Sequence, residues 1–196
     1  MPRQRALIKW VLMAWAIRET NIFLFLKMLL ADISNTASTA DWLPIVAAVV
    51  FAEAFFIAGY TKLSPMLDKW YKTFGLCAVL ADCLVILIGF AIARAACTAF
   101  GVPFSPMSFI GVLLAIQVLH DVVYYFCIVV PFPDGANRIM DYMKAYGPAS
   151  GVWAILGDSS MMLVMGFLAM ALAGAAPETS VAALLLGLYA IPYLLN

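Results

Sequence analysis

Residues 74–100 read FGLCAVLADCLVILIGFAIARAACTAF, and this stretch decides the fold. An α-helix rises about 1.5 Å per residue, so about 20 apolar residues cross the hydrocarbon layer of a bilayer. Residues 42–60, 108–130, 149–173 and 179–195 have a similar length and character. They are longer and more uniformly apolar than the strands of a membrane barrel, which alternate in polarity over about ten residues. The sequence therefore predicts an all-α, polytopic transmembrane helix bundle.

The composition of the chain agrees with a lipid environment. The 196 residues are 66% hydrophobic and 11% charged, whereas soluble domains are about 45–50% apolar and about 25% charged. A soluble domain of this length needs a charged surface, so a soluble globular enzyme is excluded. Eleven Lys and Arg balance eleven Asp and Glu, and this balance gives no indication of a nucleic-acid partner.

Residues 6–30 (ALIKWVLMAWAIRETNIFLFLKMLL) allow three interpretations. The segment is long enough to span a bilayer, but Arg18, Glu19, Thr20 and Asn21 interrupt its middle. A spanning segment gives six spans in a single membrane domain covering residues 1–196. An interfacial amphipathic helix or a cleaved signal peptide leaves five spans.

Basic residues favour one side of the bundle. Consecutive spans alternate in direction, so loops 61–73 and 131–148 share a side, which carries Lys62, Lys69, Lys72, Arg138 and Lys144. The positive-inside rule makes this side cytoplasmic. With six spans, both termini are then cytoplasmic.

The second of these loops has a helical pattern of its own. Ile139, Met140, Met143 and Tyr146 recur at helical spacing, with charged residues between them. This pattern predicts a short interfacial helix over about residues 136–146, and Pro148 is expected to end it.

Acidic residues inside the predicted spans are the main candidates for function, because ionisable groups in a bilayer are costly and usually line a functional path. Glu53, Asp82, Asp121 and Asp158 lie on four consecutive helices, each on the order of 10–14 Å from the cytoplasmic end by residue count. We expect them to converge on one cavity. Carboxylates this close in a low dielectric cannot all stay ionised, so protons, a bound cation or Arg18 must offset their charge.

One histidine accompanies these acids. His120 is a candidate proton carrier, although Asp121 follows it about 100° round the helix, so the two side chains are not expected to point into the same site. The supporting candidates are Arg18, Gln117, Tyr124 and Ser159. A single histidine and the lack of a Glu-x-x-His motif disfavour a di-metal centre, and the sequence leaves the metal and any cofactor open. No tandem or inverted repeat is evident.

Three function classes follow from this pattern. The leading hypothesis is a small membrane transporter or channel for protons or cations that uses the layer of intramembrane carboxylates. The alternatives are a non-catalytic structural subunit of a larger membrane assembly and an intramembrane enzyme acting on a lipid-soluble substrate. The expected partners are the lipid bilayer, protons or small cations, and a second copy or another membrane subunit.

Overall fold

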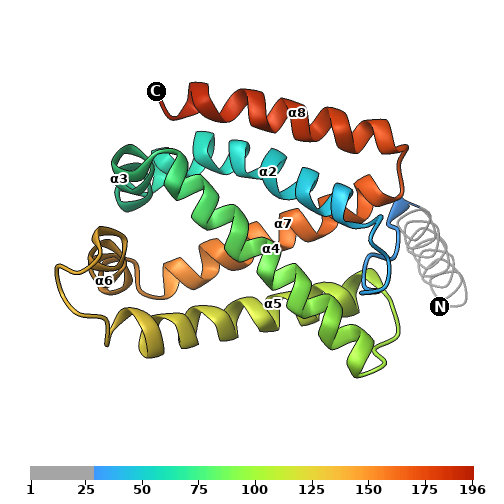
Figure 1. Ribbon diagram of the computed structural model, residues 1–196, viewed down its shortest axis with the longest axis horizontal. Coiled ribbons are helices and arrows are strands. Elements are labelled where there is room, and N and C mark those ends of the chain that lie inside the picture. The colour runs from blue at the N-terminus through green and yellow to red at the C-terminus, as the bar shows by residue number, and fades with distance from the viewer. Residues whose placement is uncertain (1–28) are drawn as a thin grey trace, which may run out of the picture.

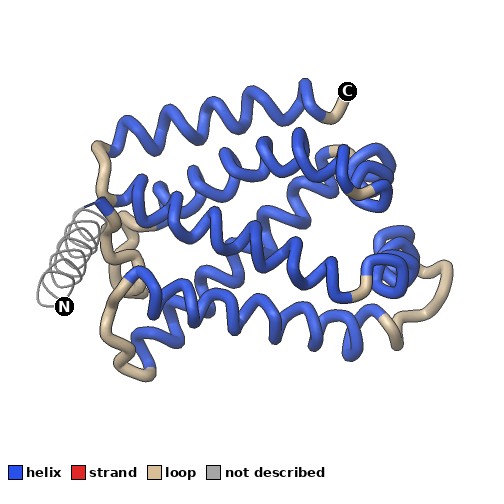
Figure 2. The backbone as a smooth tube through the Cα atoms, turned by 180° about the vertical axis from the view of Figure 1, so that it is seen from behind, coloured by secondary structure: helices blue, strands red, loops and turns tan. Residues whose placement is uncertain are grey.

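The computed structural model describes residues 29–196, and this part of the chain is all-helical, with no strand (Figures 1 and 2). Its elements are α2 (Trp42–Leu63), α3 (Pro65–Phe74), α4 (Leu76–Ala99), α5 (Pro106–Val123), the π-helix η1 (Tyr124–Val129), α6 (Arg138–Ser150), α7 (Val152–Ala173) and α8 (Pro177–Leu194). Within residues 29–196, five helices are long and apolar enough to cross a membrane: α2, α4, α5 with η1, α7 and α8. The predicted all-α bundle is therefore confirmed. The predicted first span, 6–30, lies outside the described residues except for its last two, and the sixth span stays a prediction.

Four of the long helices form a ring in which each packs against the next, in the order α2, α4, α5, α7 and back to α2. Successive helices run in opposite directions, and α8 lies along the outside of α2 (Figure 1). The short helices α3 and α6 contact each other at one end of the ring. We call this the α3–α6 end, and the C-terminus lies at the same end (Figure 1).

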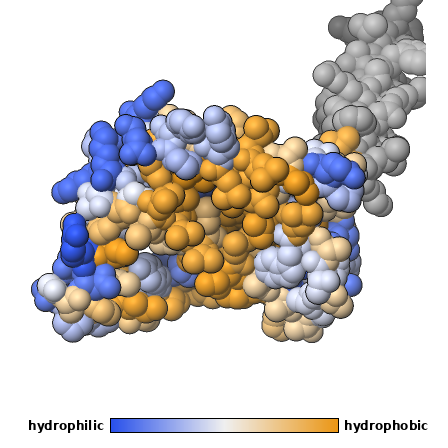
Figure 3. Space-filling model, turned by 45° about the horizontal axis from the view of Figure 1, so that its top comes forward, coloured by the Kyte–Doolittle hydropathy of each residue, from blue (hydrophilic) through white to orange (hydrophobic). Residues whose placement is uncertain are grey.

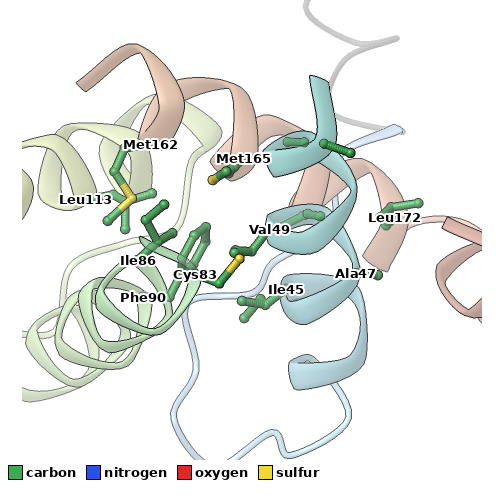
Figure 4. Close-up of a cluster of buried hydrophobic side chains, with 14 of the residues drawn as sticks. Ile45, Ala47, Val49, Cys83, Ile86, Phe90, Leu113, Met162, Met165 and Leu172 are labelled. Carbon is green, nitrogen blue, oxygen red and sulfur yellow. The ribbon is translucent and has the colours of Figure 1, made fainter. Parts of the chain in front are cut away.

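Apolar side chains from all four ring helices fill the centre of the ring. Figure 4 shows this core, in which Ile45, Val49, Cys83, Ile86, Phe90, Leu113, Met162 and Met165 gather between the helices. The outer face is apolar too: Leu80, Leu84, Ile88 and Ile92 recur every four residues along α4 and are all exposed. Figure 3 shows a hydrophobic band between two hydrophilic ends. This is the surface that a helix bundle presents to lipid.

Helix α3 occupies most of the segment that the sequence analysis assigned to a loop, 61–73, and that assignment is wrong. The Ser64 hydroxyl accepts a hydrogen bond from the Leu67 amide at 3.3 Å, and Pro65 occupies the first turn, where a missing N–H costs nothing. Trp70 and Tyr71 are buried, while the lysines of the helix face outward. The segment therefore contains an amphipathic helix of ten residues, although the sequence analysis used only its lysines, as an indication of orientation.

Helix α6 occupies the segment expected to hold a short helix, but its bounds differ from 136–146. The Asn137 side chain accepts hydrogen bonds from the amides of Ile139 and Met140, which sets the start at Arg138. The expectation that Pro148 ends the helix is wrong. The proline removes one backbone donor, and the helix continues to Ser150, where Gly151 ends it with a positive φ of 55°.

Contacts between α3 and α6 hold the two basic segments at one end. The Tyr142 hydroxyl donates to the Met66 carbonyl, and the ring of Tyr142 lies 5.4 Å from that of Trp70. Lys69, Lys72 and Lys144 thus share the α3–α6 end.

A buried arginine organises the opposite end. Arg94, on α4, is 1% exposed and donates to the carbonyls of Asn35 and Ser38 at 2.5 and 2.6 Å. Its guanidinium also pairs with Asp41 at 3.0 Å and lies over the Trp42 ring. One side chain of α4 therefore fixes the loop that leads into α2.

The close approach of α8 to α2 depends on a glycine. A Cβ added at Gly187 would lie 2.8 Å from the Val50 carbonyl oxygen and 2.9 Å from the Phe51 Cα, both backbone atoms. Small residues at such crossings let membrane helices pack backbone to backbone.

We expect Gly187→Ala to lower the free energy of unfolding by about 1–3 kcal/mol, because α8 has to shift away from α2 to admit the methyl group. Thermal unfolding in detergent measures the effect. The matched control is Gly111→Ala on α5, where a Cβ meets no atom within 4 Å. Equal melting temperatures for the two variants would contradict the backbone contact.

Candidate functional site

A cavity of about 500 Å³ lies toward the α3–α6 end of the ring. Its wall is formed by α4, α5, η1, α6 and α7, with Trp70 of α3. Most of the lining is apolar or aromatic, and the polar side chains on it are Asp82, Gln117, His120, Asp121, Tyr124, Tyr125, Tyr146 and Asp158. Volumes of about 300–1,000 Å³ with a few polar groups are typical of small-molecule sites.

Three of the four predicted acids line this cavity. Asp82 comes from α4, Asp121 from α5 and Asp158 from α7. Glu53 on α2 is not among the lining residues; it is fully buried behind the wall. The structure thus brings three carboxyl groups to one space and places the fourth beside it.

A tyrosine joins the fourth acid to the other three. The Tyr71 hydroxyl lies 2.7 Å from Glu53 Oε1 and 2.9 Å from Asp82 Oδ2. Asp82 Oδ2 also accepts a hydrogen bond from the Trp70 indole at 3.0 Å. Burial and the two nearby carboxyl groups raise the pKa of Tyr71 far above its ordinary value, so its hydroxyl keeps its proton.

The Tyr71 hydroxyl has two carboxyl contacts but only one proton to donate. A hydroxyl donates a single proton, so Tyr71 can serve only one of the two carboxyl groups fully. A proton on the other carboxyl completes the set. Because Asp82 already accepts from Trp70, Glu53 is the group that fits as the protonated donor to Tyr71. Its second oxygen, Oε2, is buried and has no hydrogen-bond partner among the described residues.

His120 and Asp121 both line the cavity, which corrects the expectation that adjacent residues could not share it. The His120 Nδ1 lies 3.3 Å from Asp121 Oδ1, which also accepts from the Gln117 amide at 2.7 Å. The cavity is wide enough to be lined from two sides of the helix. Asp121 Oδ2 is buried and makes no hydrogen bond within the part of the chain that is described.

The helix changes form where it lines the cavity. From Tyr124 to Val129 the backbone is a π-helix, in which the Val130 amide bonds to the carbonyl of Tyr125. Tyr124, Tyr125, Phe126 and Val129 of this segment all line the cavity. Such wide turns occur often at functional sites. No sequence signal predicts this π-helix, because the apolar run continues unbroken through it.

Of the four supporting candidates from the sequence, one lies outside the described residues and one does not line the cavity. Arg18 lies outside the described residues, and Ser159 is not among the residues lining the cavity. Its neighbour Ser160 lies 2.6 Å from the Tyr60 hydroxyl and so links α7 to α2. Gln117 and Tyr124 do line the cavity.

The acids of the described residues do not cluster in the way that metal ligands do. Among residues 29–196, no three His, Cys, Asp or Glu side chains lie close enough together to hold a metal ion.

The structure reveals an internal repeat that the sequence analysis missed. Residues 75–82 read GLCAVLAD and residues 151–158 read GVWAILGD, with four of eight residues identical. Gly75 and Gly151 have nearly the same backbone angles, φ 53°, ψ −128° and φ 55°, ψ −134°. Only glycine adopts such angles readily. Each glycine separates a short helix at the α3–α6 end from a long ring helix.

The repeat makes Asp82 and Asp158 equivalent. Each lies seven residues after its glycine, and each glycine follows an aromatic cavity residue, Trp70 or Tyr146, by five. The two repeat units, α2–α3–α4 and α5–η1–α6–α7, run the same way through the bundle. The matching segments GLCAVLAD and GVWAILGD are visible in the sequence. They are hard to recognise as a repeat because the surrounding segments are also apolar and similar in composition.

The equivalence fails at one informative position. The counterpart of Tyr71 is Gly147, which has no hydroxyl to offer Asp158. A Cβ at Gly147 would lie 2.2 Å from the Tyr125 ring, so that ring occupies the space. No side-chain hydrogen bond reaches Asp158 from the residues described. Asp82 Oδ2 is thus held by Trp70 and Tyr71, whereas Asp158 lines the cavity with no such donor in the described part of the chain.

We expect Tyr71→Phe to destabilise the protein by about 1–3 kcal/mol, because it leaves buried carboxyl oxygens without their partner. Thermal unfolding of Tyr71→Phe, Glu53→Gln and the double variant measures it. The two changes should be strongly non-additive, since they remove the same contact. Tyr193→Phe, at an exposed site on α8, is the matched control. Simple additivity would show that the bridging hydroxyl is not shared.

Comparison with known proteins adds no relative: the chain matches no protein-family model, no curated protein and no solved structure.

Proposed function

We propose that the protein is a small membrane transporter or channel for protons or cations, with the cavity as its binding site. The observation that carries this proposal is that carboxyl groups from three different helices line one cavity inside a membrane bundle. Intramembrane acids that face a cavity commonly mark ion pathways and proton relays.

The charge of the cavity supports a positively charged cargo. Among the residues that the structure describes, no lysine or arginine lines it, and His120 is the one basic side chain on the wall. Ionised carboxyl groups in this apolar setting gain stability from a cation or a proton. A site that binds a cation in exchange for a proton couples the transport of the cation to that of the proton.

The internal repeat also supports transport. Parallel repeats related by an axis along the membrane normal recur in transporters, and their binding sites lie between the repeats. Here α4 belongs to the first repeat unit, and α5, η1, α6 and α7 belong to the second. The cavity lies between them, with one copy of the repeated aspartate on each side.

We expect Asp121→Asn and Asp158→Asn to reduce flux at least tenfold in proteoliposomes, measured by a pH-sensitive dye under an imposed cation or pH gradient. The amide keeps the shape of the side chain and removes its charge. Asp68→Asn is the control, because Asp68 lies on the exposed face of α3 and pairs with Lys72. Flux that survives both cavity substitutions would defeat the proposal, as would protein that catalyses no flux and instead copurifies with a fixed partner or releases a lipid product.

We propose further that the α3–α6 end faces the cytoplasm, following the positive-inside rule. In a cysteine-less background, Lys69→Cys should resist an impermeant maleimide in intact cells and react after permeabilisation. Pro103→Cys, in the loop between α4 and α5 at the opposite end, should react in intact cells. The reverse pattern would invert the orientation.

A further inference from the structure

We infer that the cavity takes an amphiphilic organic ammonium ion, a protonated amine with an apolar body. This inference rests on the proposed function and names the class of its cargo. It follows from the size of the cavity, the make-up of its wall and the positions of its unpaired oxygen atoms.

The cavity is much larger than an inorganic cation requires. Its volume of about 500 Å³ compares with about 30 Å³ for one water molecule in the liquid. A dehydrated inorganic ion needs several oxygen ligands converging within about 2.0–2.6 Å. No such group of acidic side chains exists among residues 29–196. The space fits a molecule of drug-like size.

The wall suits a molecule with a large apolar part. Val85, Ile86, Val129, Ile155 and Met161 line it together with aromatic rings from three elements. The aromatic members are Trp70 of α3, Tyr124, Tyr125 and Phe126 of η1, and Tyr146 of α6. The transfer of an alkyl or aryl group from water to such an apolar wall is favourable.

The same rings favour a positively charged head group. Cations bind over the faces of tryptophan and tyrosine, and this attraction becomes stronger as water is excluded. Burial raises the pKa of Tyr146 to about 12, and the Asp158 carboxyl contributes. Tyr146 therefore stays neutral and adds no competing negative charge.

The unpaired carboxyl oxygens place the head group. Asp82 Oδ2 already accepts from Trp70 and Tyr71. Within residues 29–196, Asp121 Oδ2 is buried without a hydrogen-bond partner, and Asp158 lines the cavity and receives no side-chain hydrogen bond. An ammonium group has N–H donors for both. We assign it to the space between Asp121 and Asp158, with the apolar body against η1 and α6.

Binding of a defined amine tests this assignment on the full-length protein. The probe is 4-phenylbutylamine, with the uncharged 4-phenylbutanol as its matched control and Na⁺ as the inorganic alternative. Isothermal titration in detergent, with detergent alone as the blank, should show one amine per chain. The alcohol should bind at least tenfold more weakly, because it has the same body and no charge.

Variants then locate the bound amine. Asp121→Asn and Asp158→Asn should each weaken amine binding at least tenfold, while Asp68→Asn leaves it unchanged. The comparison of amine with alcohol on the unaltered protein keeps the test valid if a variant fails to fold. Equal affinity for amine and alcohol, or no binding of either, overturns the inference.

A parallel flux measurement separates this inference from the proposed function. If proton or Na⁺ flux is present and the amine neither binds nor inhibits it, the inference fails and the transport proposal stands. If the amine binds in a manner that depends on Asp121 and Asp158 but no flux of any cation occurs, the site stands and the transport proposal fails.

Discussion

The rest of the site depends on one hydroxyl group, that of Tyr71, placed between the carboxyl groups of Glu53 and Asp82. This contact ties α3 to both α2 and α4, although α3 is short and carries a charged outer face. It also fixes Trp70 against Asp82, so one wall of the cavity is held by hydrogen bonds rather than by apolar packing alone. Because a buried carboxyl group without a partner is costly, the contact both stabilises the fold and limits the negative charge of the site.

The two repeat units share one arrangement of helices but give their aspartates different surroundings. In the first unit a tyrosine and a tryptophan donate to one oxygen of the repeated aspartate, Asp82 Oδ2, and hold that side chain in place. In the second unit a glycine stands where the tyrosine would be, and Tyr125 of the π-helix fills the room, so Asp158 stays open to the cavity. A difference of one side chain, tyrosine against glycine, thus separates an aspartate that a neighbouring hydroxyl contacts from one that no such hydroxyl reaches.

Sequence alone predicted the bundle, because long apolar runs have few other solutions, and it singled out the acids, because their cost in lipid makes them conspicuous. It missed α3, whose charges suggested a loop and whose buried Trp70 and Tyr71 become evident only in contact with α4 and α6. It assigned no role to Arg94, yet that side chain holds the loop containing Asn35 and Asp41. The π-helix and the cavity have no sequence signature of their own, since both arise from how neighbouring helices meet.

The repeat also bears on how such a chain could arise. Each unit holds two long helices that cross the bundle in opposite directions, so the chain leaves a unit on the side where it entered. Two copies joined in tandem therefore insert with the same orientation, and the short link between α4 and α5 is enough to connect them. A unit with an odd number of crossings would need an extra helix to achieve this. Duplication and fusion of such a unit would need only a loop, after which exchange of single residues, such as tyrosine for glycine, could give the two halves separate roles.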